Sequence, residues 1–149
     1  MSKHKILVVD DEADICSLVS DILSATGEFD VVITNDPVKV EEICFSEKPD
    51  LILMDVVMPV RRGPEVAKAL KSDSKTSDIP IVIMSGLGEM VYLKDKKKWD
   101  WLPNRPIVKQ RGDVISDPHD AVSGYGVEGY IEKPFNSANL IREIKTHLK

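Results

Sequence analysis

Carboxylate residues end two apolar runs of the chain. Asp10 and Asp11 follow the run at 6–9, and Asp55 follows the run at 51–54. Short unbroken apolar runs predict strands of a parallel sheet that are buried on both faces. Ligands of such sheets bind at the carboxyl ends of the strands, so these carboxylates are well placed to hold a metal ion or to act as nucleophiles. The alternative for Asp55 is a residue that ends its strand and caps the next turn.

Helical patterns separate five predicted strands. The strands are expected at 5–9, 29–34, 51–55, 79–84 and 129–132. The helices are expected to end at Gly27, to begin at an Asp36 cap, to open at Gly63, to cover 118–125, and to follow a cap at Asn136 or Ser137. This alternation predicts an α/β fold, a flavodoxin-like doubly wound sheet of five parallel strands in the order 2-1-3-4-5. The order makes the first and third strands neighbours and therefore brings Asp10 and Asp11 beside Asp55.

Length and composition indicate a single globular domain that spans residues 1–149. The chain is 42% hydrophobic, 30% charged and only 5% aromatic, and no apolar run is long enough to cross a membrane. The two cysteines, Cys16 and Cys44, fall among the apolar positions of predicted helices, which favours buried thiols over a disulfide or metal ligands. Since no signal-peptide core is present either, we expect a cytoplasmic protein without a membrane partner.

A divalent cation is the expected companion of the clustered carboxylates. Three carboxylates at one sheet edge repel one another, and a shared cation lets all three stay ionised. Oxygen ligands without histidine or cysteine favour Mg²⁺, which completes its shell with water and phosphate. A carboxylate can also attack phosphorus and form an aspartyl phosphate. Ser85 and Lys133 end two further predicted strands, and they would add a hydroxyl and an ammonium group to stabilise a transferring phosphoryl group.

Four motifs at the strand ends resemble those of a known family, the receiver domains of two-component response regulators, in their chemotaxis-regulator-like form. The motifs are VVDDE at 8–12, LMDVVMP at 53–59 with Gly63 downstream, IMSG at 83–86 and GYIEKPF at 129–135. Each motif alone is weak evidence, but four in this order are specific. The resemblance covers nearly the whole chain outside an insertion at about 89–116, between the fourth and fifth strands.

The resemblance implies a role for each matching residue at the acidic edge. Asp55 is the expected phosphoacceptor. Asp10 and Asp11, together with Asp55 and the backbone carbonyl of Val57, are expected to hold Mg²⁺. Lys133 is expected to pair with the phosphoryl group.

The same resemblance implies a conformational switch. Ser85 corresponds to a hydroxyl that moves toward the phosphoryl oxygen, and Tyr130 to an aromatic side chain that swings inward behind it. Taken singly, Tyr130 is also typical of a strand aromatic packed against a helix, Ser85 of an ordinary turn, and Lys133 of a solvated charge. Their joint position at strand ends favours the functional interpretation.

The insertion departs from the family's pattern. Ser85 and Lys133 are 48 positions apart, far more than the pattern suggests, and residues 94–111 carry a net charge of +5 in a chain of −5 overall. A helix could begin at Met90, but no sustained period follows it. The charge and prolines favour a solvated loop, whereas Trp99 and Trp101 indicate an element for partner binding or self-association. Nucleic-acid binding is the weakest of the three interpretations, because the surrounding domain is acidic.

These observations together predict a stand-alone receiver. We expect it to accept a phosphoryl group on Asp55 from a sensor histidine kinase or a histidine phosphotransfer protein, catalysing its own phosphorylation rather than turning over an external substrate. Because no effector domain follows the last predicted helix, we expect output through contacts with a downstream protein, with a homodimer as one candidate. The alternative is a scaffold that works without phosphorylation through its insertion, and the mutual repulsion of the retained carboxylates argues against it.

Overall fold

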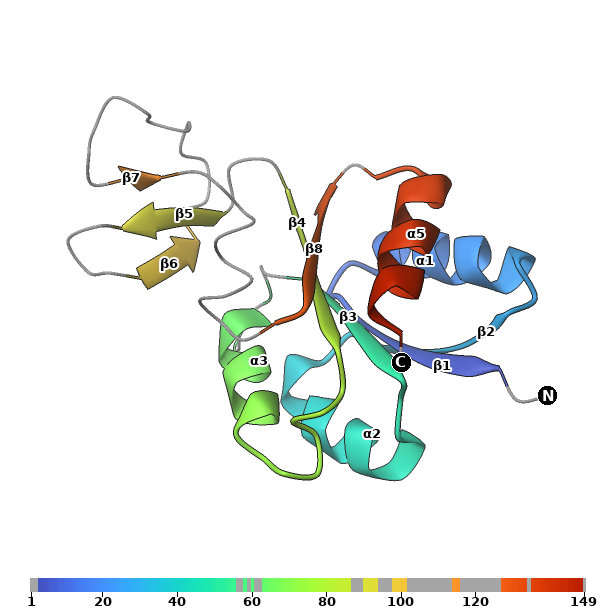
Figure 1. The fold of residues 1–149 in the computed structure, drawn as a ribbon, viewed down its shortest axis with the longest axis horizontal. Coiled ribbons are helices and arrows are strands. Elements are labelled where there is room, and N and C mark those ends of the chain that lie inside the picture. Colours follow the sequence, from blue (N-terminus) through green and yellow to red (C-terminus); the bar gives the residue numbers. More distant parts are fainter. Residues whose placement is uncertain are drawn as a thin grey trace.

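Five parallel strands form the main sheet of the computed structural model. The structure describes residues 3–55, 58, 60, 63–86, 90–93, 98–101, 114–115, 127–133 and 135–148. For residues 64, 85–86, 90–93, 98–101, 114–115 and 132–133 it describes the backbone alone. The strands are β1 (His4–Val9), β2 (Phe29–Thr34), β3 (Leu51–Asp55), β4 (Ile81–Gly86) and β8 (Gly129–Lys133). Their order is β2-β1-β3-β4-β8, and every neighbouring pair is parallel (Figure 1). The predicted fold and strand order are therefore confirmed.

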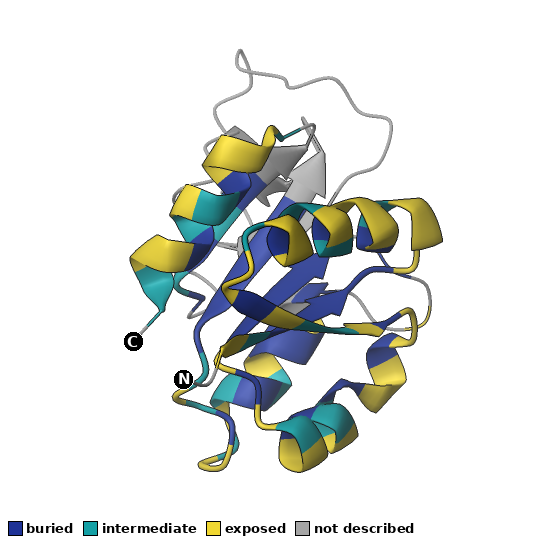
Figure 2. Cartoon of the chain, turned by 90° about the vertical axis from the view of Figure 1, so that its right-hand side faces the viewer, coloured by how far each residue is buried: buried dark blue, intermediate teal, exposed yellow. Residues whose placement is uncertain are grey.

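Helices cover both faces of this sheet. They are α1 (Ala13–Ala25), the 3₁₀ turn η1 (Pro37–Lys39), α2 (Val40–Glu47), α3 (Gly63–Lys71) and α5 (Ser137–His147). Figure 2 shows that each helix turns an exposed side outward and a buried side toward the sheet. Within the described part of the chain, no helix has the length and hydropathy needed to span a bilayer.

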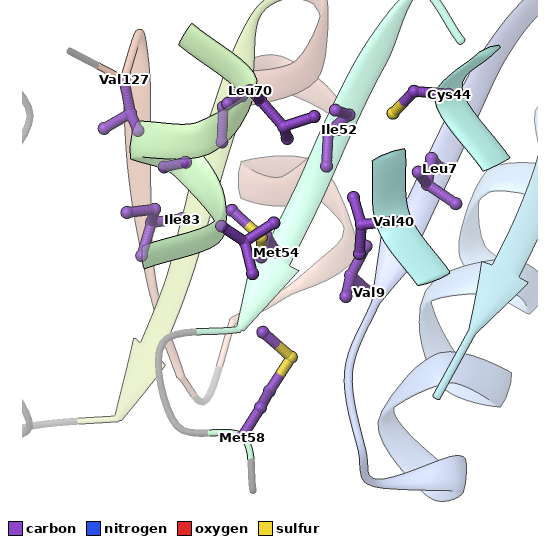
Figure 3. Close-up of a cluster of buried hydrophobic side chains, with 13 residues drawn as sticks. Leu7, Val9, Val40, Cys44, Ile52, Met54, Met58, Leu70, Ile83 and Val127 are labelled. Carbon is purple, nitrogen blue, oxygen red and sulfur yellow. The ribbon is translucent and has the colours of Figure 1, made fainter. Parts of the chain in front are cut away.

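Successive residues of each central strand pack into two different cores. Ile6 and Val8 of β1 lie in the cluster formed with α1 and α5. Leu7 and Val9 lie in the opposite cluster, formed with α2 and α3 and drawn in Figure 3. Side chains alternate across a strand, so a strand covered on both faces needs apolar residues at every position. This two-sided burial explains why the strands read as unbroken apolar runs.

Two helix starts have the caps that the sequence predicts. The Asp36 side chain accepts a hydrogen bond from the Val38 amide at 3.0 Å, although a 3₁₀ turn precedes α2 there. The Asn136 side chain accepts from the Asn139 amide at 2.8 Å, which identifies Asn136 rather than Ser137 as the cap of α5.

The fourth strand is displaced from its predicted position. It begins at Ile81 rather than Ile79 and continues through Gly86. Pro80 has no amide hydrogen for the ladder, but its carbonyl accepts a hydrogen bond from the Ile52 amide at 2.9 Å. The extra length at the other end places Ser85 inside the strand.

A second, antiparallel sheet lies in the insertion. It contains β5 (Met90–Leu93), β6 (Lys98–Trp101) and β7 (Val114–Ile115) in the order β6-β5-β7, and Figure 1 shows it apart from the main sheet on the side of β4 and β8. The helix that the sequence allows to begin at Met90 is not formed, because these residues are a strand. A four-residue apolar run fits either structure, and here pairing with two neighbours makes it a strand. The helix predicted at 118–125 lies outside the described residues.

Both cysteines are free and buried, as the sequence indicates. Burial, together with the smaller effect of the nearby Glu41 carboxylate, raises the pKa of the Cys44 thiol to about 11. The thiol of Cys44 therefore stays protonated and unreactive at neutral pH.

A polar latch joins the start of β8 to the loop between α3 and β4. The Lys71 ammonium donates to the backbone carbonyls of Ser77 at 3.1 Å and Ile79 at 2.9 Å, and to the Glu128 carboxylate at 2.5 and 2.9 Å. Glu128 also accepts from the Ile81 amide at 3.2 Å, and its own amide donates to the Ile81 carbonyl at 2.9 Å. The Lys71 and Glu128 side chains are only 20% and 30% exposed, so solvent screens this pair weakly.

Replacing Lys71 with methionine tests the latch. The free energy of unfolding should fall by about 1–3 kcal/mol, because a partly buried carboxylate and two carbonyls lose their donor. Urea denaturation measures the change. Lys68→Met, on the exposed side of the same helix, is the matched control and should change stability by less than about 0.5 kcal/mol. Equal losses in the two variants would show that the latch contributes nothing specific.

Val60 adopts a left-handed backbone conformation after β3. Its φ is 72° and its side chain is 91% exposed, while Met58, two residues earlier, is buried beneath the end of β3 (Figure 3). For a β-branched residue this conformation costs about 1–2 kcal/mol. Val60 lies in sequence between the buried Met58 and the start of α3 at Gly63, and its own backbone carries this strain.

The Val60→Gly variant should therefore be more stable than the original protein. Relief of the left-handed strain should exceed the added entropy of the unfolded chain and raise the free energy of unfolding by about 0.5–1 kcal/mol. Val38→Gly is the control, since Val38 is also exposed but lies in a 3₁₀ turn without positive φ, and it should lose stability. A loss at both positions would contradict the assignment of strain to Val60.

Candidate functional site

The carboxyl ends of β1 and β3 bring the predicted acidic residues together. These two strands pair directly, with Val9 opposite Met54, so Asp10 and Asp55 follow neighbouring positions in the ladder. Asp11 is the next residue of the loop into α1. One carboxylate oxygen from each of Asp10, Asp11 and Asp55 lies within 4.8 Å of the other two. The prediction that strand order gathers these three carboxylates is confirmed.

Burial differs sharply among the three carboxylates. Asp10 is fully buried and Asp55 is 2% exposed, whereas Asp11 is exposed. A buried charge is costly unless it is paired or hydrogen-bonded, and two of them side by side also repel each other. The exposed third carboxylate gives a cation access to the pair from solvent. We call Asp10, Asp11 and Asp55 the acidic corner.

Both the backbone and the side chain of Asp10 form hydrogen bonds. The Asp10 amide donates to the Thr34 carbonyl at 3.3 Å, which extends the β1–β2 ladder by one step. The Asp10 carbonyl accepts from the Asn35 side-chain amide at 2.8 Å and from the Cys16 thiol at 3.4 Å. The Asp10 carboxylate accepts from the Glu12 amide at 2.9 Å, which closes an Asx turn at the start of α1.

The remaining predicted residues of the main sheet end adjacent strands. In the β3–β4 ladder Asp55 pairs with Met84, so Ser85 is one position beyond the register partner of Asp55. Lys133 is the last residue of β8 and pairs with Gly86. Tyr130 pairs with Ile83 and is partly buried against the cluster formed with α2 and α3. The fold thus gathers the ends of β1, β3, β4 and β8 at one edge.

The three other predicted residues are Val57, Trp99 and Trp101. Val57, whose carbonyl is the expected metal ligand, lies outside the described residues. Trp99 and Trp101 belong to β6 of the second sheet, apart from the main sheet.

The donor set of the acidic corner fits a hard divalent cation. All three side chains offer oxygen, and the group contains no histidine or cysteine ligand. Oxygen donors of this kind suit Mg²⁺, which binds through one or two carboxylates and keeps several waters. The spacing of the oxygen atoms is compatible with one ion shared among the three residues.

A separate cavity lies at the opposite edge of the sheet. It has a volume of about 560 Å³ and is lined by Cys44, Phe45, Lys48, Pro49, Lys75 and Ile79. Pro49 and Ile79 precede β3 and β4, so this cavity opens near the amino ends of the strands, and no carboxylate lines it. Its chemistry is distinct from that of the acidic corner.

Sequence reasoning missed two partners of the acidic corner, Asn35 and Cys16. The sequence predicts Cys16 only as a buried residue of the first helix, and it predicts no role for Asn35. A signal for Asn35 does exist, because it directly follows β2, the neighbour of β1 in the predicted strand order. A polar residue that follows this strand lies at the same edge of the sheet as Asp10.

Comparisons with known proteins agree with this fold. The family model described as "Response regulator receiver domain" matches residues 6–100. The phosphate regulon transcriptional regulatory protein PhoB of Pseudomonas aeruginosa is 30% identical over 146 residues, which cover 97% of this chain and 51% of that protein. The DNA-binding dual master transcriptional regulator RpaA of Synechocystis sp. is 26% identical over 147 residues, covering 97% and 49%. The chain thus spans about half the length of these curated relatives.

Solved structures share the same architecture. The chemotaxis response regulator CheY4 of Vibrio cholerae has a TM-score of 0.73 at 23% identity, covering 99% of this chain and 100% of that one. At this identity the likeness speaks for the fold alone. Together with the matched family model and the 30% identical relative, it leads to one conclusion: the chain belongs to the family of response regulator receiver domains of two-component systems.

Proposed function

We propose that this receiver accepts a phosphoryl group on Asp55, in a reaction that needs Mg²⁺. The observation that carries the proposal is the acidic corner, in which the buried Asp55 lies within 4.8 Å of two further carboxylates at the end of the central strands. Such an arrangement is unfavourable by itself and becomes useful when a cation and a phosphate oxygen share it. Phosphorylation on aspartate is general to the family to which the chain belongs.

The proposed reaction is a direct transfer between two groups. One carboxylate oxygen of Asp55 attacks the phosphorus, and a new O–P bond forms while the P–N bond of a phosphohistidine breaks. The bonding electron pair leaves with the imidazole nitrogen, which is then protonated. Mg²⁺, when bound by Asp10, Asp11 and Asp55, supplies positive charge beside the phosphoryl oxygens. The buried carboxylates orient the attack and limit access of water.

We assign the remaining roles from position in the sheet. Lys133, at the end of β8, is the proposed cation for the phosphoryl group, and Ser85, at the end of β4, the proposed hydroxyl partner. Tyr130 is the proposed switch aromatic. Its partly buried position, with register partner Ile83 two residues before Ser85, supports coupling between these two residues.

A sensor histidine kinase or a histidine phosphotransfer protein is the proposed phosphodonor. The output is proposed to pass through protein contacts of the receiver, in keeping with receiver domains in general. Two buried free thiols are compatible with the reducing conditions of the cytoplasm, which is the proposed location. The curated relatives are named as transcriptional regulators and are about twice as long as this chain.

Phosphorylation is tested directly by intact mass after incubation with acetyl phosphate and Mg²⁺. The protein should gain one phosphoryl group, and Asp55→Asn should gain none because the nucleophilic carboxylate is gone. Asp30→Asn, an exposed change of the same type on β2, is the matched control and should be phosphorylated normally. Failure to gain a phosphoryl group when calorimetry shows bound Mg²⁺ would favour the scaffold interpretation instead.

The second sheet is the proposed surface for self-association. In its antiparallel register Trp99 pairs with Tyr92, and Trp101 with Met90. Residues directly opposite one another share a face of the sheet, so these four positions lie on the same face. The basic segment 94–111, at +5, complements the −10 carried by the rest of the chain. A second copy can therefore supply an acidic surface for this basic, aromatic element.

A double variant, Trp99→Ala with Trp101→Ala, tests this surface. Sedimentation velocity of the phosphorylated protein should show a dimer that weakens with added salt, and the variant should dissociate at least about tenfold more readily, because two aromatic anchors are lost. Lys98→Ala with Asp100→Ala is the matched control, since those positions share the other face of β6. Circular dichroism confirms that each variant is folded.

Two results would contradict self-association. One is a monomeric protein in both phosphorylation states. The other is a dimer that both double variants weaken equally, which would point to loss of the sheet rather than of one face. Binding to a single-stranded oligonucleotide without self-association would instead favour the nucleic-acid interpretation of the insertion.

A further inference from the structure

A small hydrogen-bond network closes around the backbone carbonyl of Asp10. The Asn35 side-chain amide donates to this carbonyl at 2.8 Å, and the Cys16 thiol donates to it at 3.4 Å. The side-chain nitrogen Nδ2 of Asn35 also lies 3.4 Å from the sulfur of Cys16. The three groups come from the ends of β1 and β2 and from the first turn of α1, so the network ties three elements together at one point.

The carbonyl at the centre of this network controls the peptide between Asp10 and Asp11. A peptide group is planar, so holding its oxygen fixes the rotation of the whole unit. That rotation sets where the Cα atom of Asp11 lies relative to Asp10. Two further hydrogen bonds already fix Asp10: its amide donates to the Thr34 carbonyl, and its carboxylate accepts from the Glu12 amide.

Asp11 depends on this peptide more than the other two carboxylates do. Asp10 and Asp55 are buried, and the packing around them fixes their positions. Asp11 is exposed and has no such packing, yet its carboxylate must stay within 4.8 Å of the other two for a shared cation. The orientation of its preceding peptide is therefore the main means by which the fold can place it.

We propose that Asn35 and Cys16 are positioning residues that set the affinity of the acidic corner for Mg²⁺. They act through the Asp10 carbonyl rather than by contact with the metal or the phosphoryl group. The proposal rests on the proposed function, because it assumes that Mg²⁺ binds at Asp10, Asp11 and Asp55. Asn35 makes the larger contribution, since an amide is a stronger donor than a thiol and its bond is shorter.

Asn35→Leu is the principal test. Leucine has nearly the shape of asparagine but donates no hydrogen bond, and it shields the carbonyl from water. Mg²⁺ affinity, measured by titration calorimetry, should fall about tenfold, the lower end of the range for groups that orient metal ligands. Asn35→Ala should lose less, because Asn35 is exposed and water can enter to replace the amide.

The kinetic readout separates positioning from simple loss of structure. The Mg²⁺ concentration for half-maximal phosphorylation by acetyl phosphate should rise in Asn35→Leu by the same factor as the dissociation constant. The rate at saturating Mg²⁺ should stay close to that of the unchanged protein, because the nucleophile and its surroundings are intact. A fall in the saturated rate with unchanged Mg²⁺ affinity would overturn the proposal.

The cysteine gives an independent test by conservative rescue. Cys16→Ala removes the thiol donor and should weaken Mg²⁺ binding, whereas Cys16→Ser keeps a donor and should restore most of the affinity. Cys44→Ala, a change of the same type in the other buried free cysteine, and Asn139→Leu, on the exposed side of α5, are the matched controls. Both controls should leave the Mg²⁺ dissociation constant unchanged.

The outcomes distinguish this proposal from the proposed function. If the unchanged protein does not bind Mg²⁺, the proposed function fails. If it binds Mg²⁺ and is phosphorylated, but Asn35→Leu and Cys16→Ala bind Mg²⁺ as tightly as it does, only the positioning role fails. Weaker binding in the controls to the same degree would also overturn the positioning role, since it would reflect general destabilisation.

Discussion

The pairing of β1 with β3 is the constraint on which the rest of the molecule depends, because it holds two buried carboxylates side by side. At an effective dielectric constant of about 20, two carboxylates about 5 Å apart repel by about 3 kcal/mol. The fold offsets this cost with apolar packing on both faces of the same strands, where Val9 and Met54 directly precede the two acids. The strands most firmly held in the core are therefore the ones that carry the groups most unfavourable to bring together.

This arrangement explains which features the sequence could predict. Strands buried on both faces must be apolar throughout, so the runs before Asp10 and Asp55 indicate both the strands and the position of the acids after them. The helix caps at Asp36 and Asn136 depend on neighbours two or three residues away, and they too can be read from local sequence. The acidic corner follows from strand order, since a parallel sheet brings all carboxyl ends to one edge.

Interactions between segments that are distant in the sequence could not be predicted, because they depend on the tertiary arrangement. Lys71 and Glu128 are 57 residues apart, and nothing in the local pattern of either marks it as a partner of the other. The bond from Asn35 to the Asp10 carbonyl likewise depends on how β2 and α1 approach each other in space. The sequence left the structure of Met90–Leu93 open for a different reason: its pairing partners in β6 and β7, rather than its own residues, decide that it is extended.

The latch at Glu128 also explains how a long insertion can sit between β4 and β8 without disturbing the main sheet. The amide and carboxylate of Glu128 bind the first residue of β4, and they set the register of β8 before its first residue, Gly129. The entropy cost of closing a loop grows only slowly with its length, so a few hydrogen bonds at this point can offset the added cost of a longer connection.

The position of β4 then suggests why the insertion is a suitable output element. On one side β4 pairs with β3, which ends in Asp55, and on the other with β8, which carries Tyr130; its own last residue, Gly86, leads toward the second sheet. In the proposed mechanism, Ser85 responds to the phosphoryl group at the end of this strand, so a shift there reaches the start of the insertion first. The coupling must be reciprocal: a partner that binds the second sheet more tightly in the phosphorylated form stabilises the phosphorylated form by the same free energy. The insertion would then influence the acidic corner as strongly as the acidic corner influences it.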